Sequence, residues 1–183
     1  MSTEIESMAI ELPIVEHHPN REPFRGVLTM VDVASDRAPA GARGRRVVLL
    51  RTAAEAALAS LLGMGLDYAP SLDRHDVQRK VGVITRAEIV GRNLEVGGYL
   101  FGRDFPNVVE EIRTSRRKIL GMSYELTDAE VADPRADIWV LRKVTFTGAA
   151  LLRRDKAAYR NTWIELGPVA AIDRPGKMKQ EKI

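Results

Sequence analysis

The chain has 183 residues, of which 45% are hydrophobic and 29% charged, and this composition suits one globular domain with a sizeable core. The absence of cysteine excludes disulfides and cysteine-ligated metal centres, and it fits a reducing compartment. The formal net charge is only +3, basic residues are not interleaved with aromatic ones, and no apolar run approaches the roughly 20 residues of a membrane span. Neither nucleic-acid binding nor a membrane anchor is favoured.

The N-terminal part predicts a leader, two strands and a helix. Residues 1–23 contain three prolines, which deny the hydrogen bonds that strands need, so we expect a flexible leader. Residues 24–33 and 45–50 are strand-like and enclose a loop rich in Pro, Gly and Ala. A helix is predicted from Thr52, with Glu55 at the spacing of a capping box and glycines ending it near residue 63.

The segment from residue 65 to residue 79 has no hydrophobic period and several turn formers, so it is predicted to be a loop. A hairpin follows, and then a helix capped by Asp104 with Pro106 in its first turn. Two more strands are predicted around a turn at Asp133-Pro134, and a short helix near the end. In chain order the hairpin strands cover 80–90 and 94–101, the later strands 119–126 and 138–151, and the short helix 156–159.

This order of elements favours a mainly β (α+β) fold, a small closed or nearly closed β-barrel flanked by helices. Helices do not alternate regularly with strands, so a flat α/β sheet is not favoured. We expect the barrel domain to cover residues 24–166 and a disordered polar tail to cover 167–183.

Two residues are candidates for chemistry. His75, the only histidine outside the leader, lies in a polar segment before a strand, where it can be a surface residue or a general base. Ser123 lies in Gly121-Met122-Ser123, and period-two alternation places it on the less apolar face of its strand. Spacing alone permits a Ser/His pair but does not require one, and the Gly-x-Ser-x-Gly turn of α/β-hydrolases is absent here.

The segment from Asp67 to Tyr159 resembles the tailed-phage prohead maturation proteases, relatives of the herpesvirus assemblins. The likeness rests on a histidine before a Gly-Val/Ile strand (His75, then Val81-Gly82-Val83-Ile84), on a hairpin covering Leu94 to Leu100, and on a helix leading to Gly121-Met122-Ser123. The resemblance implies a herpesvirus-protease-like barrel in which Ser123 is the nucleophile and His75 its general base.

The third catalytic position departs from the family. Members commonly carry an acidic residue in the strand after the serine, where this sequence has Thr147. A threonine hydroxyl can orient an imidazole but cannot balance imidazolium charge as a carboxylate does. Thr147 occupies the position of the family's third catalytic residue. Asp73, Asp76 or Glu125 could replace it as the acid that orients His75.

The resemblance implies a serine endopeptidase that cleaves scaffold and capsid-protein extensions inside an assembling procapsid, in the host cytoplasm. Such an enzyme needs no metal or organic cofactor, and it can cut its own terminal segments or form homo-oligomers. The alternative is a catalytically silent relative that binds capsid or scaffold as a structural protein. A nucleic-acid-associated barrel is a weaker third reading.

Overall fold

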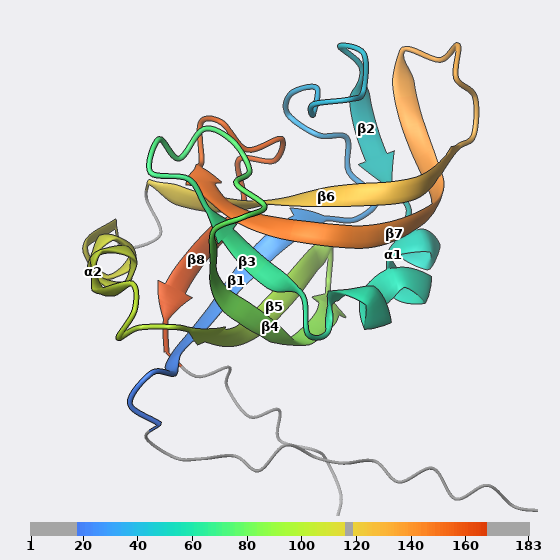
Figure 1. Cartoon of the computed structure of the whole chain (residues 1–183). Helices are drawn as coiled ribbons and strands as arrows, with labels where there is room; N and C mark the ends of the chain where they lie inside the picture. The colour runs from blue at the N-terminus through green and yellow to red at the C-terminus, as the bar shows by residue number, and fades with distance from the viewer. Residues whose placement is uncertain (1–17, 116–118, 168–183) are drawn as a thin grey trace, which may run out of the picture.

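The computed structural model describes residues 18–115 and 119–167, and these residues form one eight-stranded sheet with two helices (Figure 1). The sheet is strongly curled, and the chain is mainly β, as predicted. The elements are β1 (Glu22–Met30), β2 (Arg46–Leu49), α1 (Arg51–Ala57), a 3-10 turn (Leu58–Leu61), β3 (Gly65–Tyr68), β4 (Lys80–Val90), β5 (Asn93–Leu100), α2 (Pro106–Ser115), β6 (Leu120–Val131), β7 (Ile138–Arg153) and β8 (Trp163–Leu166).

The long strand β7 organises the sheet. Along one edge it pairs with β6 in an antiparallel ribbon, and along the other it pairs in parallel with β2 near its start and with β3 near its end. From β3 the sheet continues through β4, β5 and β1 to β8. Figure 1 shows these strands curling round a common interior.

A closed or nearly closed barrel was predicted, and the sheet is a curled half-barrel that does not close. Across the described ranges β6 pairs only with β7 and β8 only with β1, which leaves each of them one free edge. The two edges meet through a side chain instead of a strand ladder, because the Met122 backbone N–H donates to Thr162 Oγ1 at 3.2 Å.

The interior holds the apolar side chains that alternate along the strands. Phe24, Leu28, Ile84, Leu100 and Phe146 are almost completely buried there. The ring of Tyr124 packs edge-on against that of Phe146, with 5.6 Å between the ring centroids. α1 lies against β7 and α2 against β8, and no helix in the described ranges is long and apolar enough to cross a membrane.

The hairpin of β4 and β5 and the pair of β6 and β7 are found as predicted, but four local predictions are wrong. Thr52 lies inside α1 and does not cap it, since Leu50 takes the cap position without a side-chain bond. The segment assigned to a loop begins with β3. Residues 156–159 form a turn rather than a helix, and β8 follows where no strand was expected.

The domain boundaries fall close to the chain ends that the structure describes. β1 begins at Glu22 and therefore includes Pro23, which was assigned to the leader. Residues 1–17 of the predicted leader and the polar tail from residue 168 lie outside the described residues.

Candidate active site

Three neighbouring strands place Ser123 and an acidic residue on the face of the sheet opposite the barrel interior. The register aligns Asp67 of β3 with Ala150 of β7, and Ala150 with Ser123 of β6. Residues paired across strands share a face, because side chains alternate along each strand. Met122 and Tyr124 point into the core, so Ser123 points away from it with Asp67 and Ala150.

Two residues farther along, the same face carries Glu125 opposite Gly148. A Cβ added at Gly148 would lie 2.8 Å from Glu125 Oε2, so this glycine makes room for the carboxylate. Gly148 and Ala150 of β7 have little or no side chain. They therefore leave space on this face between Asp67 of β3 and the Ser123–Glu125 segment of β6, and this space is called the floor of the site below.

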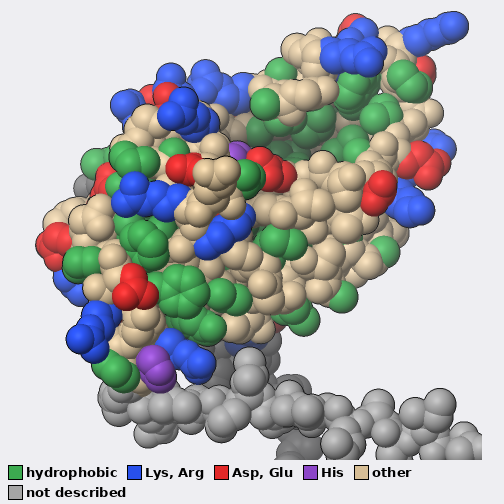
Figure 2. All heavy atoms as spheres, in the orientation of Figure 1, with side chains coloured by type: hydrophobic (Ala, Val, Ile, Leu, Met, Phe, Trp, Pro, Cys, Tyr) green, Lys and Arg blue, Asp and Glu red, His purple; other side chains and the backbone are tan. Residues whose placement is uncertain are grey.

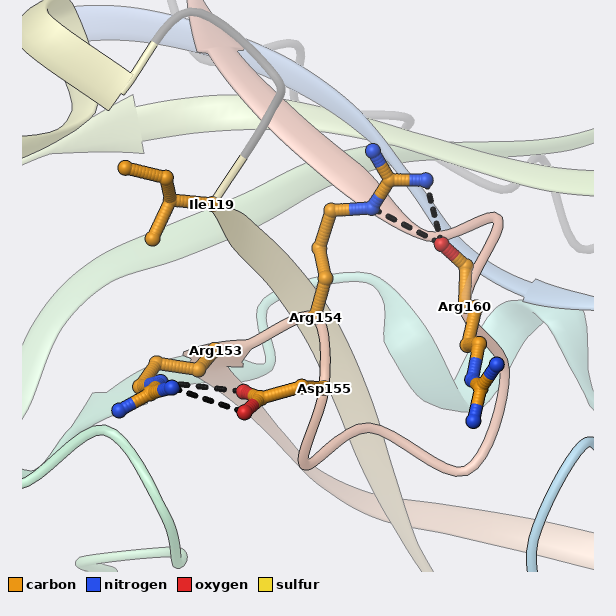
Figure 3. A pocket seen from close by; sticks show the side chains of 5 residues that line it. All are labelled: Ile119, Arg153, Arg154, Asp155 and Arg160. Atoms are coloured by element: carbon orange, nitrogen blue, oxygen red, sulfur yellow. Dashed lines mark hydrogen bonds and ion pairs between the residues drawn. The ribbon is translucent and has the colours of Figure 1, made fainter.

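Figure 2 shows a recess on one face of the molecule, lined partly by apolar side chains, with a histidine and acidic side chains at its edge and basic side chains farther out. A separate pocket lies past the end of β7, lined by Ile119, Arg153, Arg154, Asp155 and Arg160 (Figure 3).

Two of the three guanidinium groups of that pocket are engaged within the chain. Arg153 forms a two-pronged ion pair with Asp155, and Arg154 donates to the backbone carbonyl of Arg160 (Figure 3). The Arg153 backbone N–H donates to the carbonyl of Leu72 at 2.8 Å, which fastens the loop between β3 and β4 to the end of β7.

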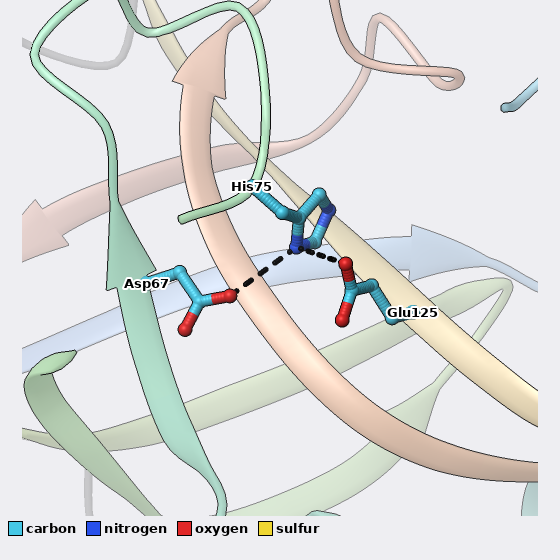
Figure 4. Close-up of side chains that lie close together, drawn as sticks. All are labelled: Asp67, His75 and Glu125. Carbon is cyan, nitrogen blue, oxygen red and sulfur yellow. Dashed lines mark ion pairs between the residues drawn. The ribbon is translucent and has the colours of Figure 1, made fainter. Parts of the chain in front are cut away.

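His75 extends from this loop over the floor and lies between two carboxylates (Figure 4). Its Nδ1 atom is 3.4 Å from Asp67 Oδ2 and 3.4 Å from Glu125 Oε1. The His75 side chain is 17% exposed, so the pair of carboxylates faces an imidazole that is largely shielded from water. Neither contact has the alignment of a hydrogen bond.

Asp67 is the most buried charged group of the site. Its side chain is 0% exposed, and Lys80 Nζ donates to Asp67 Oδ1. A buried carboxylate needs such a partner, because desolvation otherwise disfavours its charge. The second oxygen, Asp67 Oδ2, has no hydrogen-bond partner in the described chain and faces His75.

The sequence-predicted residues divide into two groups. His75, Ser123 and Glu125 come to one face of the sheet, although the described residues show no hydrogen bond between His75 and Ser123. Thr147 is exposed in an irregularity of the β6–β7 pairing, and its side chain forms no hydrogen bond within the described ranges. The carboxylates, rather than Thr147, contact the imidazole.

The other two acids suggested from the sequence are engaged in the loop itself. Asp73 accepts a hydrogen bond from Ser71, which lowers the pKa of this carboxyl, and Asp76 accepts one from the Gln78 backbone. Asp67 was missed as a site residue. The signal that could have found it is a single acidic residue between Leu66 and Tyr68, both of which are buried in β3.

Comparison with known proteins adds no relative. No protein-family model, curated protein or solved structure matches this chain.

Proposed function

We propose that this chain is a serine endopeptidase of the kind that matures phage proheads, with Ser123 as nucleophile and His75 as general base. One observation carries the proposal: His75 Nδ1 lies 3.4 Å from each of two carboxylates, on the face of the sheet where Ser123 lies. Asp67 and Glu125 then take the orienting role that Thr147 was expected to fill.

The carboxylates give the imidazole the tautomer that a base requires. Two negative groups beside Nδ1 favour a proton on that nitrogen, which leaves Nε2 with a free lone pair. They also stabilise the imidazolium that forms when Nε2 takes a proton. A hydroxyl such as that of Thr147 could supply the orientation but not the charge.

The proposed reaction is acyl transfer. The Ser123 Oγ–H proton passes to His75 Nε2 while Oγ bonds to the peptide carbonyl carbon, and the carbonyl electron pair moves to oxygen. The carbon–nitrogen bond then breaks, and the imidazolium returns its proton to the leaving amine. Water, activated in the same way, releases the acyl group. Arg153 and Arg154 already have partners, which favours backbone amides as donors to the oxyanion.

The substrates in this proposal are scaffold protein and capsid-protein extensions, cut inside an assembling procapsid in the host cytoplasm. The terminal segments of the protease are substrates of the same kind, because enzymes confined in a shell meet each other at high effective concentration. The support is the resemblance of Asp67–Tyr159 together with the geometry at His75.

A fluorophosphonate probe tests the chemistry directly. The probe should modify one serine, mapped by mass spectrometry to Ser123, and labelling should vanish in Ser123→Ala. Ser71→Ala is the matched control, since Ser71 lies exposed in the same loop as His75 and should leave labelling unchanged.

Co-expression with the cognate capsid protein tests the biology. The capsid chain should be shortened by the wild-type protein and remain full length with Ser123→Ala. The wild-type protein could instead enter the particle without being labelled and without cleaving capsid protein. That result would favour the alternative, a catalytically silent relative that binds capsid or scaffold.

A further inference from the structure

In the cluster of Asp67, His75 and Glu125, two buried polar atoms lack a hydrogen bond within the described residues, and the orienting role proposed for the carboxylates does not account for this. Asp67 Oδ2 and His75 Nδ1 are both buried and both without a hydrogen-bond partner in the part of the chain described. Such atoms are costly to bury unsatisfied, each by about 1–3 kcal/mol. Both lie beside Glu125 (Figure 4), and one possible ligand atom from each of the three residues lies within 4.8 Å of the other two.

We propose that Asp67 Oδ2, His75 Nδ1 and Glu125 Oε1 form a binding site for a divalent transition-metal ion, with zinc as the best-suited ion. The metal site exists whether or not Ser123 is a nucleophile, but the two roles of His75 exclude each other in one molecule. A metal on Nδ1 leaves the ring proton on Nε2, so zinc should block the labelling of Ser123.

The separations fit a shared metal better than they fit hydrogen bonds. Zinc binds histidine nitrogen and carboxylate oxygen at about 2.0–2.2 Å, so two ligands of a tetrahedral ion lie about 3.3 Å apart. The two distances from His75 Nδ1, to Asp67 Oδ2 and to Glu125 Oε1, are each 3.4 Å. One imidazole and two carboxylates leave a fourth position for water, as in open zinc sites.

The surroundings of the ligands support a cation. Lys80 holds Asp67 Oδ1 and so turns Oδ2 toward His75, in the way that outer partners orient metal-binding carboxylates. With His75 neutral, the two carboxylates outweigh the single ammonium of Lys80, so the cluster attracts positive charge. Gly148 leaves the space in which the Glu125 carboxylate lies.

Calorimetric titration of the metal-stripped full chain with zinc chloride tests the site. The wild-type protein should bind one zinc ion, and His75→Gln and Glu125→Gln should each weaken binding by about 100-fold or more, since loss of even an outer partner costs 10–100-fold. His18→Gln is the matched control, because His18 is exposed and its Nδ1 accepts only a neighbouring backbone N–H.

Two further measurements separate metal binding from misfolding and from proteolysis. Cobalt should give the visible absorption of a four-coordinate ion in the wild-type protein and in Ser123→Ala, but not in His75→Gln. Circular dichroism should show that Glu125→Gln is folded, as expected for a side chain that is 37% exposed.

The proposal is overturned if the wild-type protein shows no saturable zinc binding up to about 0.1 mM. It is equally overturned if the double variant His75→Gln/Glu125→Gln binds zinc as tightly as the wild-type protein does. Zinc binding that persists in Ser123→Ala, together with a metal-free wild-type protein that never labels with the fluorophosphonate, supports the metal site and removes the protease.

Discussion

The β6–β7 ribbon is built differently at its two ends. At the site end, Leu120 to Glu125 pairs with Gly148 to Arg153 without a register shift, and β3 pairs along the other edge of β7. At the tip, beyond Glu125, the pairing shifts three times, and Asp128 adopts a positive φ of 51°.

The side chains differ as sharply as the pairing does. β7 carries Gly148, Ala149 and Ala150 at the site end, all buried, whereas Arg142 and Lys143 nearer the tip are exposed. A regular three-strand segment with small residues can hold the acids and His75 in fixed positions, while an irregular ribbon end tolerates change. Mutations should therefore have large effects at the site end and small ones at the tip.

The largest effect is expected for His75→Gln. Loss of the proposed base should slow fluorophosphonate labelling of Ser123 on the order of 10⁴-fold, because the serine hydroxyl is no longer deprotonated. Thr127→Ala at the tip should leave the labelling rate unchanged. The rate of Ser123 labelling is measured by mass spectrometry. Equal rates in the His75 variant and the wild type would remove His75 from the mechanism.

Lys80→Met should have the largest effect on stability. It keeps the side-chain stem but removes the ammonium group from Asp67, whose side chain is 0% exposed. We expect the free energy of unfolding to fall by about 2 kcal/mol, less than for a fully buried pair because Lys80 is 38% exposed.

The matched control for that change is Lys143→Met, which removes an exposed ammonium group from the same sheet and should stay within about 0.5 kcal/mol. Urea unfolding monitored by circular dichroism gives both values. Equal losses in the two variants would mean that Asp67 does not depend on Lys80.

Gly148→Ala should separate geometry from stability. The new Cβ would lie 2.8 Å from Glu125 Oε2, so the carboxylate must swing away from His75 toward solvent. The unfolding free energy should change by less than about 1 kcal/mol, because the end of a flexible side chain can move, whereas labelling of Ser123 should slow about 10-fold.

A double-mutant cycle checks the cause of that loss. In the Glu125→Gln background, Gly148→Ala should add little further slowing if both changes act through the same contact. Fully additive effects would show that Gly148 matters for some other reason. Thr145→Val, at the tip, should slow nothing in either background.

A second comparison, between long and short strands, explains which parts of the fold the sequence could predict. The long alternating runs of β4, β5, β6 and β7 predicted strands because each carries its own apolar period. β3 and β8 have only four residues each, and their strand state depends on pairing with β7 and β1. Barrel closure could not be predicted for a related reason. It depends on whether β6 and β8, which are distant in sequence, pair with each other, and no local sequence pattern indicates this.

Some residues of the candidate site could be proposed from the sequence, and one could not. His75 and Ser123 were proposed because their positions follow the order of elements in a resembling family, and Glu125 was among the substitute acids. The structure brings these three residues to one face of the sheet. Asp67 was missed because a carboxylate in a four-residue strand is visible as a site residue only once Lys80 and His75 are seen to contact it.

The smallest effect is expected for Tyr68→Phe, beside the site on β3. The Tyr68 hydroxyl donates to Glu111 Oε2 of α2 at 2.8 Å, so its loss should lower the unfolding free energy by about 1 kcal/mol at neutral pH. Burial, followed by the bond to Glu111, raises the pKa of Tyr68 from 10.0 to about 12.

The raised pKa fixes the sign of the pH dependence. The folded chain favours the neutral phenol, so this contribution to stability is complete below pH 10.0 and is lost as the pH rises toward about 12. Phenylalanine cannot ionise, and Tyr68→Phe should therefore lose less stability over that interval than the wild type. Buried Tyr124, with its pKa raised to about 12, keeps part of the slope in both proteins. Urea unfolding across this alkaline range measures the difference, and parallel curves for the two proteins would show that Tyr68 does not hold α2 against β3 through its neutral hydroxyl.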